Sequence, residues 1–166
     1  IDAGVTVFKI EGRARSAEYV KTVARCYRDA ADAVLAGKYT PEYASELKER
    51  LSTVFNRGFW DGYYQGARLG EWSEVYGNKA TKSKKYIGKV TNYFSNIGVA
   101  EILIETGSIS VGDNVIIIGP STGVVEVTVE EIRVDLKSTE SAVKGEYCSI
   151  AVPEKLRRSD KLYLFQ

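Results

Sequence analysis

Three charged side chains that could bind an anion lie close together near the start of the chain. Lys9, Glu11 and Arg13 fall where a predicted strand, residues 5–10, gives way to a predicted helix. An arginine presents a planar fork that binds a carboxylate or a phosphate through two hydrogen bonds. These three side chains are therefore candidates for substrate binding. The alternative is structural, with Glu11 and Arg13 fixing the strand-to-helix turn by an ion pair.

A fourth candidate, Arg57, stands between Asn56 and Gly58 at the end of a second predicted helix. It could contact a substrate or the junction between two domains. Asn and Gly both tolerate a left-handed backbone, so the same run is typical of a helix stop that leaves arginine on the surface. The structural interpretation is favoured at this position.

The stretch from Phe59 to Tyr76 is dense in aromatic residues, and lysines follow it. Nucleic-acid bases stack on aromatic rings and lysines follow phosphates, so this composition suits RNA. The candidate contacts are Trp60, Tyr64, Lys82, Lys84 and Lys85. The favoured alternative is that the rings pack against a neighbouring domain and that the lysines are solvated.

The composition excludes several kinds of active site. Histidine is absent, and the two cysteines, Cys26 and Cys148, lack the spacing of metal ligands. Ser-His and Cys-His nucleophile pairs are ruled out, so we predict no catalytic residue, metal or cofactor in this chain. The net charge of +1 provides no overall attraction to nucleic acid or to an anionic membrane. Few cysteines favour the reducing cytoplasm, and no apolar run approaches the ~20 residues of a membrane span.

The elements that must position the candidates begin with helices. Ser16 is expected to cap a helix that Gly37 ends, and Thr40 with Pro41 to begin a second one. A strand that feeds a single helix cannot bury its own edges, so residues 5–36 suggest one βα unit of a larger parallel sheet. We therefore expect the chain to be part of a longer protein. An exposed strand can also pair with a second copy, which would give a homodimer.

Three segments are predicted along the chain, and together they give an α+β fold class. Residues 1–76 hold the strand and helices, residues 77–83 form a polar linker, and residues 84–166 form a small antiparallel β-barrel. Short β-branched runs separated by turn residues define the predicted strands of the barrel. They are Tyr86–Phe94, Val99–Ile104, Asn114–Ile118, Val124–Val134, Glu146–Val152 and Lys161–Phe165.

Two groups of motifs resemble known families. The barrel segment resembles domain two of elongation factor Tu in Ile87–Val90, Gly98–Ala100, Ile109–Asp113 and Val115–Ile117. The front half of the chain resembles the collagenase-like peptidase family U32 in Phe8–Arg13, Ser16, Glu18–Val20, Tyr27-Arg28 and Asn56–Phe59 with Gly62. The order of these motifs, followed by a translation-factor-like barrel, resembles that family over nearly the whole chain.

The resemblance implies a main body that is a TIM-type barrel, with this chain beginning just before the last strand of that body. Lys9, Glu11 and Arg13 would then lie at the carboxyl end of that strand, where active sites of this fold are built. It also implies upstream cysteines that hold an iron–sulfur cluster. Characterised members hydroxylate RNA bases or quinone precursors, whereas the peptidase name comes from collagenase and protease assignments.

Three functions follow as hypotheses. In the first, the chain is a non-catalytic accessory part that positions transfer RNA or ribosomal RNA against the upstream catalytic domain, by analogy with translation factors. In the second, it grips a protein or collagen-like substrate for a peptidase. In the third, the barrel serves only for domain packing or self-association. No membrane is expected as a partner.

Overall fold

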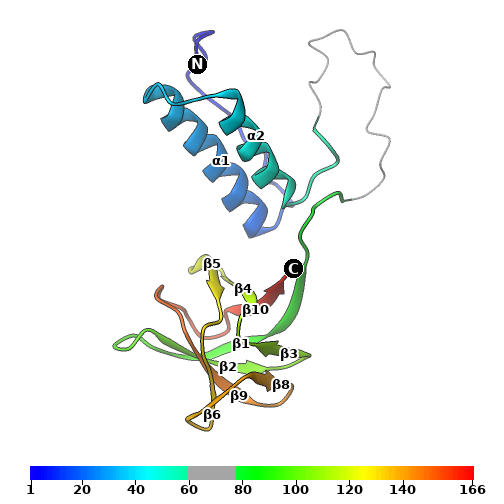
Figure 1. The fold of residues 1–166 in the computed structure, drawn as a ribbon, viewed down its shortest axis with the longest axis vertical. Helices are drawn as coiled ribbons and strands as arrows, with labels where there is room; N and C mark the ends of the chain where they lie inside the picture. The colour runs from blue at the N-terminus through cyan, green and yellow to red at the C-terminus, as the bar shows by residue number, and fades with distance from the viewer. Residues whose placement is uncertain (60–77) are drawn as a thin grey trace. The chain divides into compact units, whose positions relative to one another are not determined.

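A computed structural model describes residues 1–59 and 78–166 of the chain (Figure 1). The chain divides into two compact units, Ile1–Lys82 and Ser83–Gln166. The first unit contains the helices and the second contains the strands, so the α+β class is confirmed for the described residues. The predicted linker over 77–83 stays a prediction.

Helix α1 (Ala17–Leu35) begins and ends where the sequence predicts. Ser16 is the N-cap residue with extended backbone, although its side chain makes no capping hydrogen bond. Gly37 ends the helix in a left-handed conformation, with φ of 65°. The N–H of Gly37 donates to Val34 O, and that of Lys38 donates to Ala33 O, a pair of bonds that satisfies the last carbonyls of a helix.

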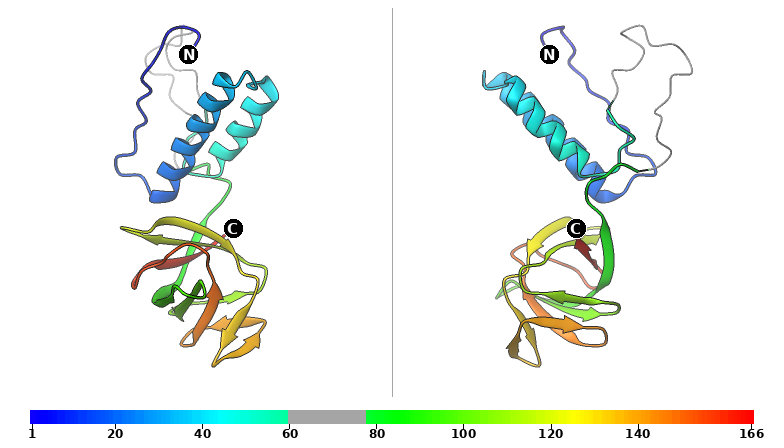
Figure 2. Two further views of the ribbon diagram at one scale, coloured as in Figure 1. Left: turned by 90° about the vertical axis from the view of Figure 1, so that its left-hand side faces the viewer. Right: turned by 45° about the vertical axis from the view of Figure 1, so that its right-hand side comes forward.

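Helix α2 (Pro41–Ser52) packs beside α1, as the two views of Figure 2 show. Thr40 Oγ1 accepts a hydrogen bond from Tyr43 N at 3.2 Å, and Pro41 occupies the first turn, where its missing N–H costs nothing. Among the described residues of this unit, the buried side chains are Val23, Cys26, Leu47 and Val54. At one side of this small core, Arg50 Nη1 of α2 lies 2.9 Å from Asp29 Oδ2 of α1.

The strand predicted over residues 5–10 is wrong for the structure of this chain. The segment is extended but makes no ladder with any described residue, and its side chains are exposed, Val7 by 81%. A strand is defined by hydrogen bonds to a partner strand, and none of the residues described in the first unit, 1–59 and 78–82, forms one. The β-branched residues therefore favour an extended backbone, but no described segment of the unit provides a partner strand.

The second unit is an antiparallel β structure around one core. Its main sheet has the order β5-β4-β10-β1-β2-β9-β6-β7, and a second sheet pairs β3 with β8. The strands are β1 (Lys84–Phe94), β2 (Val99–Ile104), β3 (Ser108–Ser110), β4 (Asn114–Gly119), β5 (Gly123–Thr128), β6 (Ile132–Val134), β7 (Lys137–Thr139), β8 (Ser141–Val143), β9 (Tyr147–Ala151) and β10 (Lys161–Phe165).

Side chains from both sheets meet in the same interior, including Ile109 of β3 and Ala142 of β8. The other fully covered residues include Ile87, Ile102, Ile104, Val115, Ile117, Ile132, Ile150 and Leu162. A small antiparallel β unit is thereby confirmed, whereas closure into a barrel stays a prediction. The predicted strand over 124–134 is two strands, β5 and β6, because the chain leaves β4 after Thr128 and next pairs with β9.

Candidate nucleic-acid interface

The outer surface of the main sheet carries one row of side chains that crosses four neighbouring strands. Lys161 of β10 pairs with Lys89 of β1, Lys89 pairs with Leu103 of β2, and Leu103 pairs with Tyr147 of β9. The next residue in each strand, among them Leu162 and Cys148, is buried in the core. Because successive side chains in a strand point to opposite faces, the four members of the row share the outer face.

A second, shorter row lies beside the first. Tyr86 of β1 and Tyr163 of β10 are register partners, and their rings meet edge to face at 5.6 Å between centroids. Lys84 Nζ lies 5.1 Å from the centroid of the Tyr163 ring, a cation–π arrangement. A bulge between Tyr86 and Gly88 shifts the register, so Tyr86 and Lys89 both face outward although three positions separate them.

Glu105, which follows β2, ties the two rows together. Its carboxylate accepts a hydrogen bond from the Tyr86 hydroxyl and lies 2.7 Å from Lys89 Nζ. The hydrogen bond to Glu105 raises the pKa of Tyr86 to about 12, with burial of the phenol as a further cause. The hydrogen bonds from Lys89 and Tyr86 lower the pKa of Glu105. Glu105 is therefore ionised at neutral pH and holds one ring and one lysine in place.

We call this surface the tyrosine–lysine face, and it comprises Lys84, Tyr86, Lys89, Leu103, Glu105, Tyr147, Lys161 and Tyr163. It holds three lysines against one carboxylate, so it is locally basic in a chain whose net charge is only +1. Tyr147, at the β9 end of the first row, is 55% exposed. Flat rings beside cations on a sheet are the elements with which proteins stack bases and hold phosphates.

The predicted RNA contacts are only partly on this face. Lys84 belongs to it, while Lys85 is the exposed next residue of β1 and Lys82 is exposed at the end of the first unit. Trp60 and Tyr64 lie outside the described residues. Sequence reasoning did not single out the three tyrosines, Lys89 or Lys161. The Lys-x-Tyr spacing at 84–86 and 161–163 was a signal, but only the register shows that the two pairs are adjacent.

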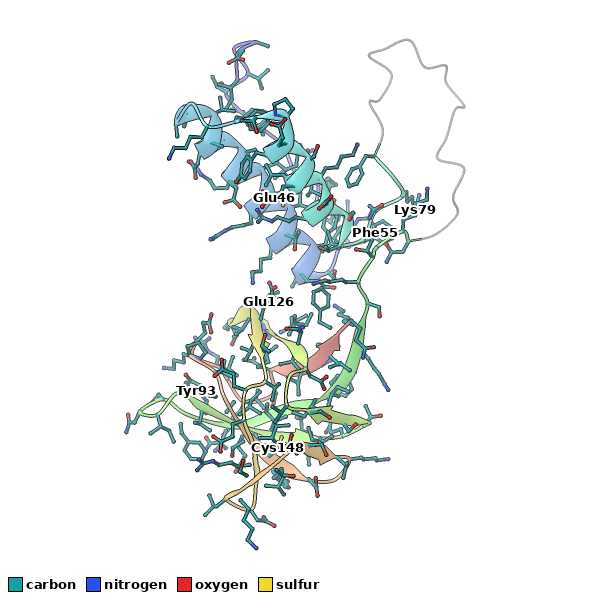
Figure 3. All side chains as sticks on the ribbon, viewed as in Figure 1. Glu46, Phe55, Lys79, Tyr93, Glu126 and Cys148 are labelled. Atoms are coloured by element: carbon teal, nitrogen blue, oxygen red, sulfur yellow. The ribbon has the colours of Figure 1, made fainter. Side chains whose placement is uncertain are left out.

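The substrate-binding candidates all lie in the first unit. Lys9 is exposed in the extended segment before α1. Glu11 Oε1 accepts a hydrogen bond from Arg13 N at 2.7 Å, so Glu11 fixes the turn through the backbone. Arg57 follows α2, where its guanidinium lies 6.0 Å from the centroid of the Phe55 ring. Phe55, labelled in Figure 3, comes from the loop that ends the helix pair.

The described residues contain no cluster of three or more His, Cys, Asp or Glu side chains that could hold a metal ion. Cys26 and Cys148 are free thiols buried in different units. Burial raises the pKa of both, that of Cys148 to about 12, so neither is a nucleophile at neutral pH. None of the helices in the described ranges is both long and apolar enough to cross a membrane.

Comparisons with known proteins bear on both units. The "Collagenase" of Porphyromonas gingivalis strain W83 is 57% identical over 99% of this chain and 40% of its own length. The "tRNA hydroxylation protein P1" of Bacillus subtilis is 30% identical over 80% of this chain and 31% of its own. The chain thus spans less than half the length of these curated relatives.

Among solved structures, the C-terminal domain of a protein assigned to the U32 peptidases in Geobacillus thermoleovorans matches 47% of this chain and 89% of its own, at 19% identity and a TM-score of 0.45. The family model of peptidase family U32 matches residues 1–74. Residues 1–74 thus match peptidase family U32, which confirms the resemblance that the motifs in residues 8–62 predicted.

Proposed function

We propose that this chain is a non-catalytic part of a U32 protein and that its tyrosine–lysine face binds RNA, so that the substrate is held for a reactive centre elsewhere in the protein. The observation that carries the proposal is the arrangement of Tyr86, Tyr163 and Lys84, two paired rings with a cation over one of them. Among the relatives, the tRNA hydroxylation protein of Bacillus subtilis supports RNA as the ligand class.

Charge and shape give different roles to different members of the face. Lys84, Lys89 and Lys161 supply attraction to phosphates, which is independent of base sequence and sensitive to salt. The tyrosine rings supply stacking, worth about 1–3 kcal/mol per base where it has been measured in other proteins. Glu105 is negatively charged and repels a phosphate. Its role is therefore to hold Tyr86 and Lys89 in position.

The experiment is a titration of the whole 166-residue chain with transfer RNA at low and at physiological salt. The test variant is Lys84→Gln with Lys161→Gln, and the matched control is Lys137→Gln with Lys155→Gln, which removes the same charge from exposed positions outside the face. The test variant is expected to weaken binding at least tenfold and to flatten the salt dependence, because fewer counterions are released. Equal weakening by both variants, or no binding at low salt, would refute the proposal.

A second candidate function is the binding of a protein substrate, which the collagenase of Porphyromonas gingivalis favours. Exposed Tyr147 and the neighbouring apolar Leu103 could contact a polypeptide as well as a base. A titration of the same variants with gelatin, beside the titration with transfer RNA, distinguishes the two functions. If gelatin binds the chain and Tyr147→Ser abolishes that binding while the lysine variants have no effect, the face is a peptide-binding surface.

A further inference from the structure

A groove in the first unit has the chemistry of a site for a small anion. It has a volume of about 330 Å³, within the range of small-molecule pockets. Two arginines, four phenyl or phenol rings and apolar side chains line it, and none of its described lining residues is acidic. They are Arg15, Tyr19, Val23, Tyr27, Leu51, Phe55, Asn56, Arg57, Gly58 and Phe59.

Arg15 reaches the groove from the turn that precedes α1. The N–H of Arg15 donates to Gly12 O at 3.1 Å, and Ala14 is left-handed with φ of 56°, so the direction of the chain is set just before the arginine. The guanidinium carbon of Arg15 lies 4.1 Å from the centroid of the Phe55 ring and 5.7 Å from that of Tyr19. Stacking on Phe55 fixes the plane of the guanidinium and leaves its edge available for hydrogen bonds.

Arg57 reaches the same ring from a loop that is held internally. Asn56 Nδ2 donates to the carbonyls of Ser52 and Val54, and Asn56 Oδ1 accepts from Gly58 N. Gly58 takes a left-handed conformation with φ of 91°, which closes the loop. The loop is therefore ordered by hydrogen bonds between the Asn56 side chain and the backbone around it, and Phe55 and Arg57 lie together without any ligand.

We propose that this groove binds a small organic anion that combines a planar ring with a carboxylate or a phosphate. The edge of the Arg15 guanidinium binds the anionic group, and the walls formed by Tyr19, Tyr27 and Phe59 accept the ring. The absence of a lining carboxylate among the described residues argues against a cationic ligand. The proposal is independent of RNA binding by the second unit, because it rests on other residues.

The ligand class has two sources that an experiment can separate, a nucleotide and an aromatic acid. The whole chain is titrated by calorimetry with adenosine 5′-monophosphate, with benzoate and with uncharged adenosine. Binding of either anion at least tenfold more tightly than adenosine supports the site and identifies the source. Equal affinity for adenosine and its monophosphate, with no binding of benzoate, or no binding of either anion at millimolar concentration, overturns the proposal.

Variants distinguish a ligand site from a purely structural stack of arginine on phenylalanine. Arg15→Gln is expected to weaken binding of the anion about tenfold, because it removes a charged hydrogen-bond donor. Arg25→Gln removes the same charge from the exposed surface of α1 and is the control. Thermal melting is measured on every variant. If Arg15→Gln lowers the melting temperature but leaves the affinity unchanged, Arg15 is structural and the proposal fails.

Discussion

The carboxylate of Asp160 occupies the space that a side chain on Gly119 would need. Asp160 is the buried charged residue of the described chain, with 2% of its surface exposed. Its Oδ2 accepts hydrogen bonds from Thr122 Oγ1 at 2.6 Å and from Arg157 N at 2.8 Å. These bonds join the β4–β5 hairpin to the turn before β10, so a charge that would be costly to bury alone accepts two hydrogen bonds.

Replacing Gly119 by alanine is therefore expected to destabilise the second unit by about 2 kcal/mol, within the usual cost of overpacking. The new methyl group must displace a short, buried and hydrogen-bonded side chain, which cannot move aside as the end of a flexible one would. Urea denaturation followed by tyrosine fluorescence measures the change. Ser121→Ala, on the exposed tip of the same hairpin, is the control and should change stability little.

Tyr86 should ionise at a higher pH than an ordinary tyrosine. The folded state raises its pKa from 10 to about 12 through the hydrogen bond to Glu105, so the protonated phenol is favoured by folding. The stabilisation from this bond is fully present below pH 10 and is lost between about pH 10 and 12. In a pH titration of the folded protein followed by absorbance at 295 nm, a late phase near pH 12 is expected, and Tyr86→Phe should remove it.

The cause of the shift is tested by Glu105→Gln. Without the carboxylate, Tyr86 is expected to titrate close to pH 10, and the late phase should merge with those of the other phenols. Titration in urea provides the reference, because the unfolded chain retains no bond between the two residues. A late phase that persists in Glu105→Gln would show that burial, rather than the hydrogen bond, controls the ionisation of Tyr86.

Local chemistry in the sequence predicted much of the fold. Thr40 and Pro41 specify the start of α2, and Gly37 specifies the end of α1, because each acts through contacts within a few residues. The strands Val99–Ile104 and Lys161–Phe165 have the bounds that alternation predicted. Strands β3, β7 and β8 were not predicted, since three residues are too few to show a period.

The candidate site depended on information that no local pattern contains. Lys161 and Lys89 are far apart in the sequence, and only the register between β10 and β1 makes them neighbours. A shift of one residue would place Tyr163 in the core and Leu162 outside. Arg15 was not singled out for a similar reason, because its partner Phe55 follows a different helix.

The ion pair between Asp29 and Arg50 should contribute a small, measurable coupling between the two helices. The two groups lie 2.9 Å apart, but their side chains are 27% and 39% exposed, so solvent screens the attraction. A double-mutant cycle with Asp29→Ala and Arg50→Ala is expected to give about 0.5 kcal/mol. Denaturation is followed by far-ultraviolet circular dichroism at 222 nm, to which the helices contribute most. Salt should reduce the coupling, and a value independent of salt would contradict its ionic origin.

The β6–β7 hairpin offers a change that should stabilise the protein. Its two-residue turn, Asp135-Leu136, has positive φ at both positions, 50° and 65°, and Leu136 is 91% exposed. A left-handed leucine costs roughly 1–2 kcal/mol relative to a residue without a Cβ, and this one buries almost nothing in return. Leu136→Gly creates the Asp-Gly pair that such turns favour and should raise stability by about 1 kcal/mol.

Lys137→Gly is the matched control for that prediction. It introduces the same residue one position later, in β7, where the backbone pairs with Val134 and glycine should weaken the strand. Urea denaturation of the two variants should therefore shift in opposite directions. If Leu136→Gly lowers the midpoint as Lys137→Gly does, the exposed leucine stabilises the hairpin by a contact, and the turn is not strained.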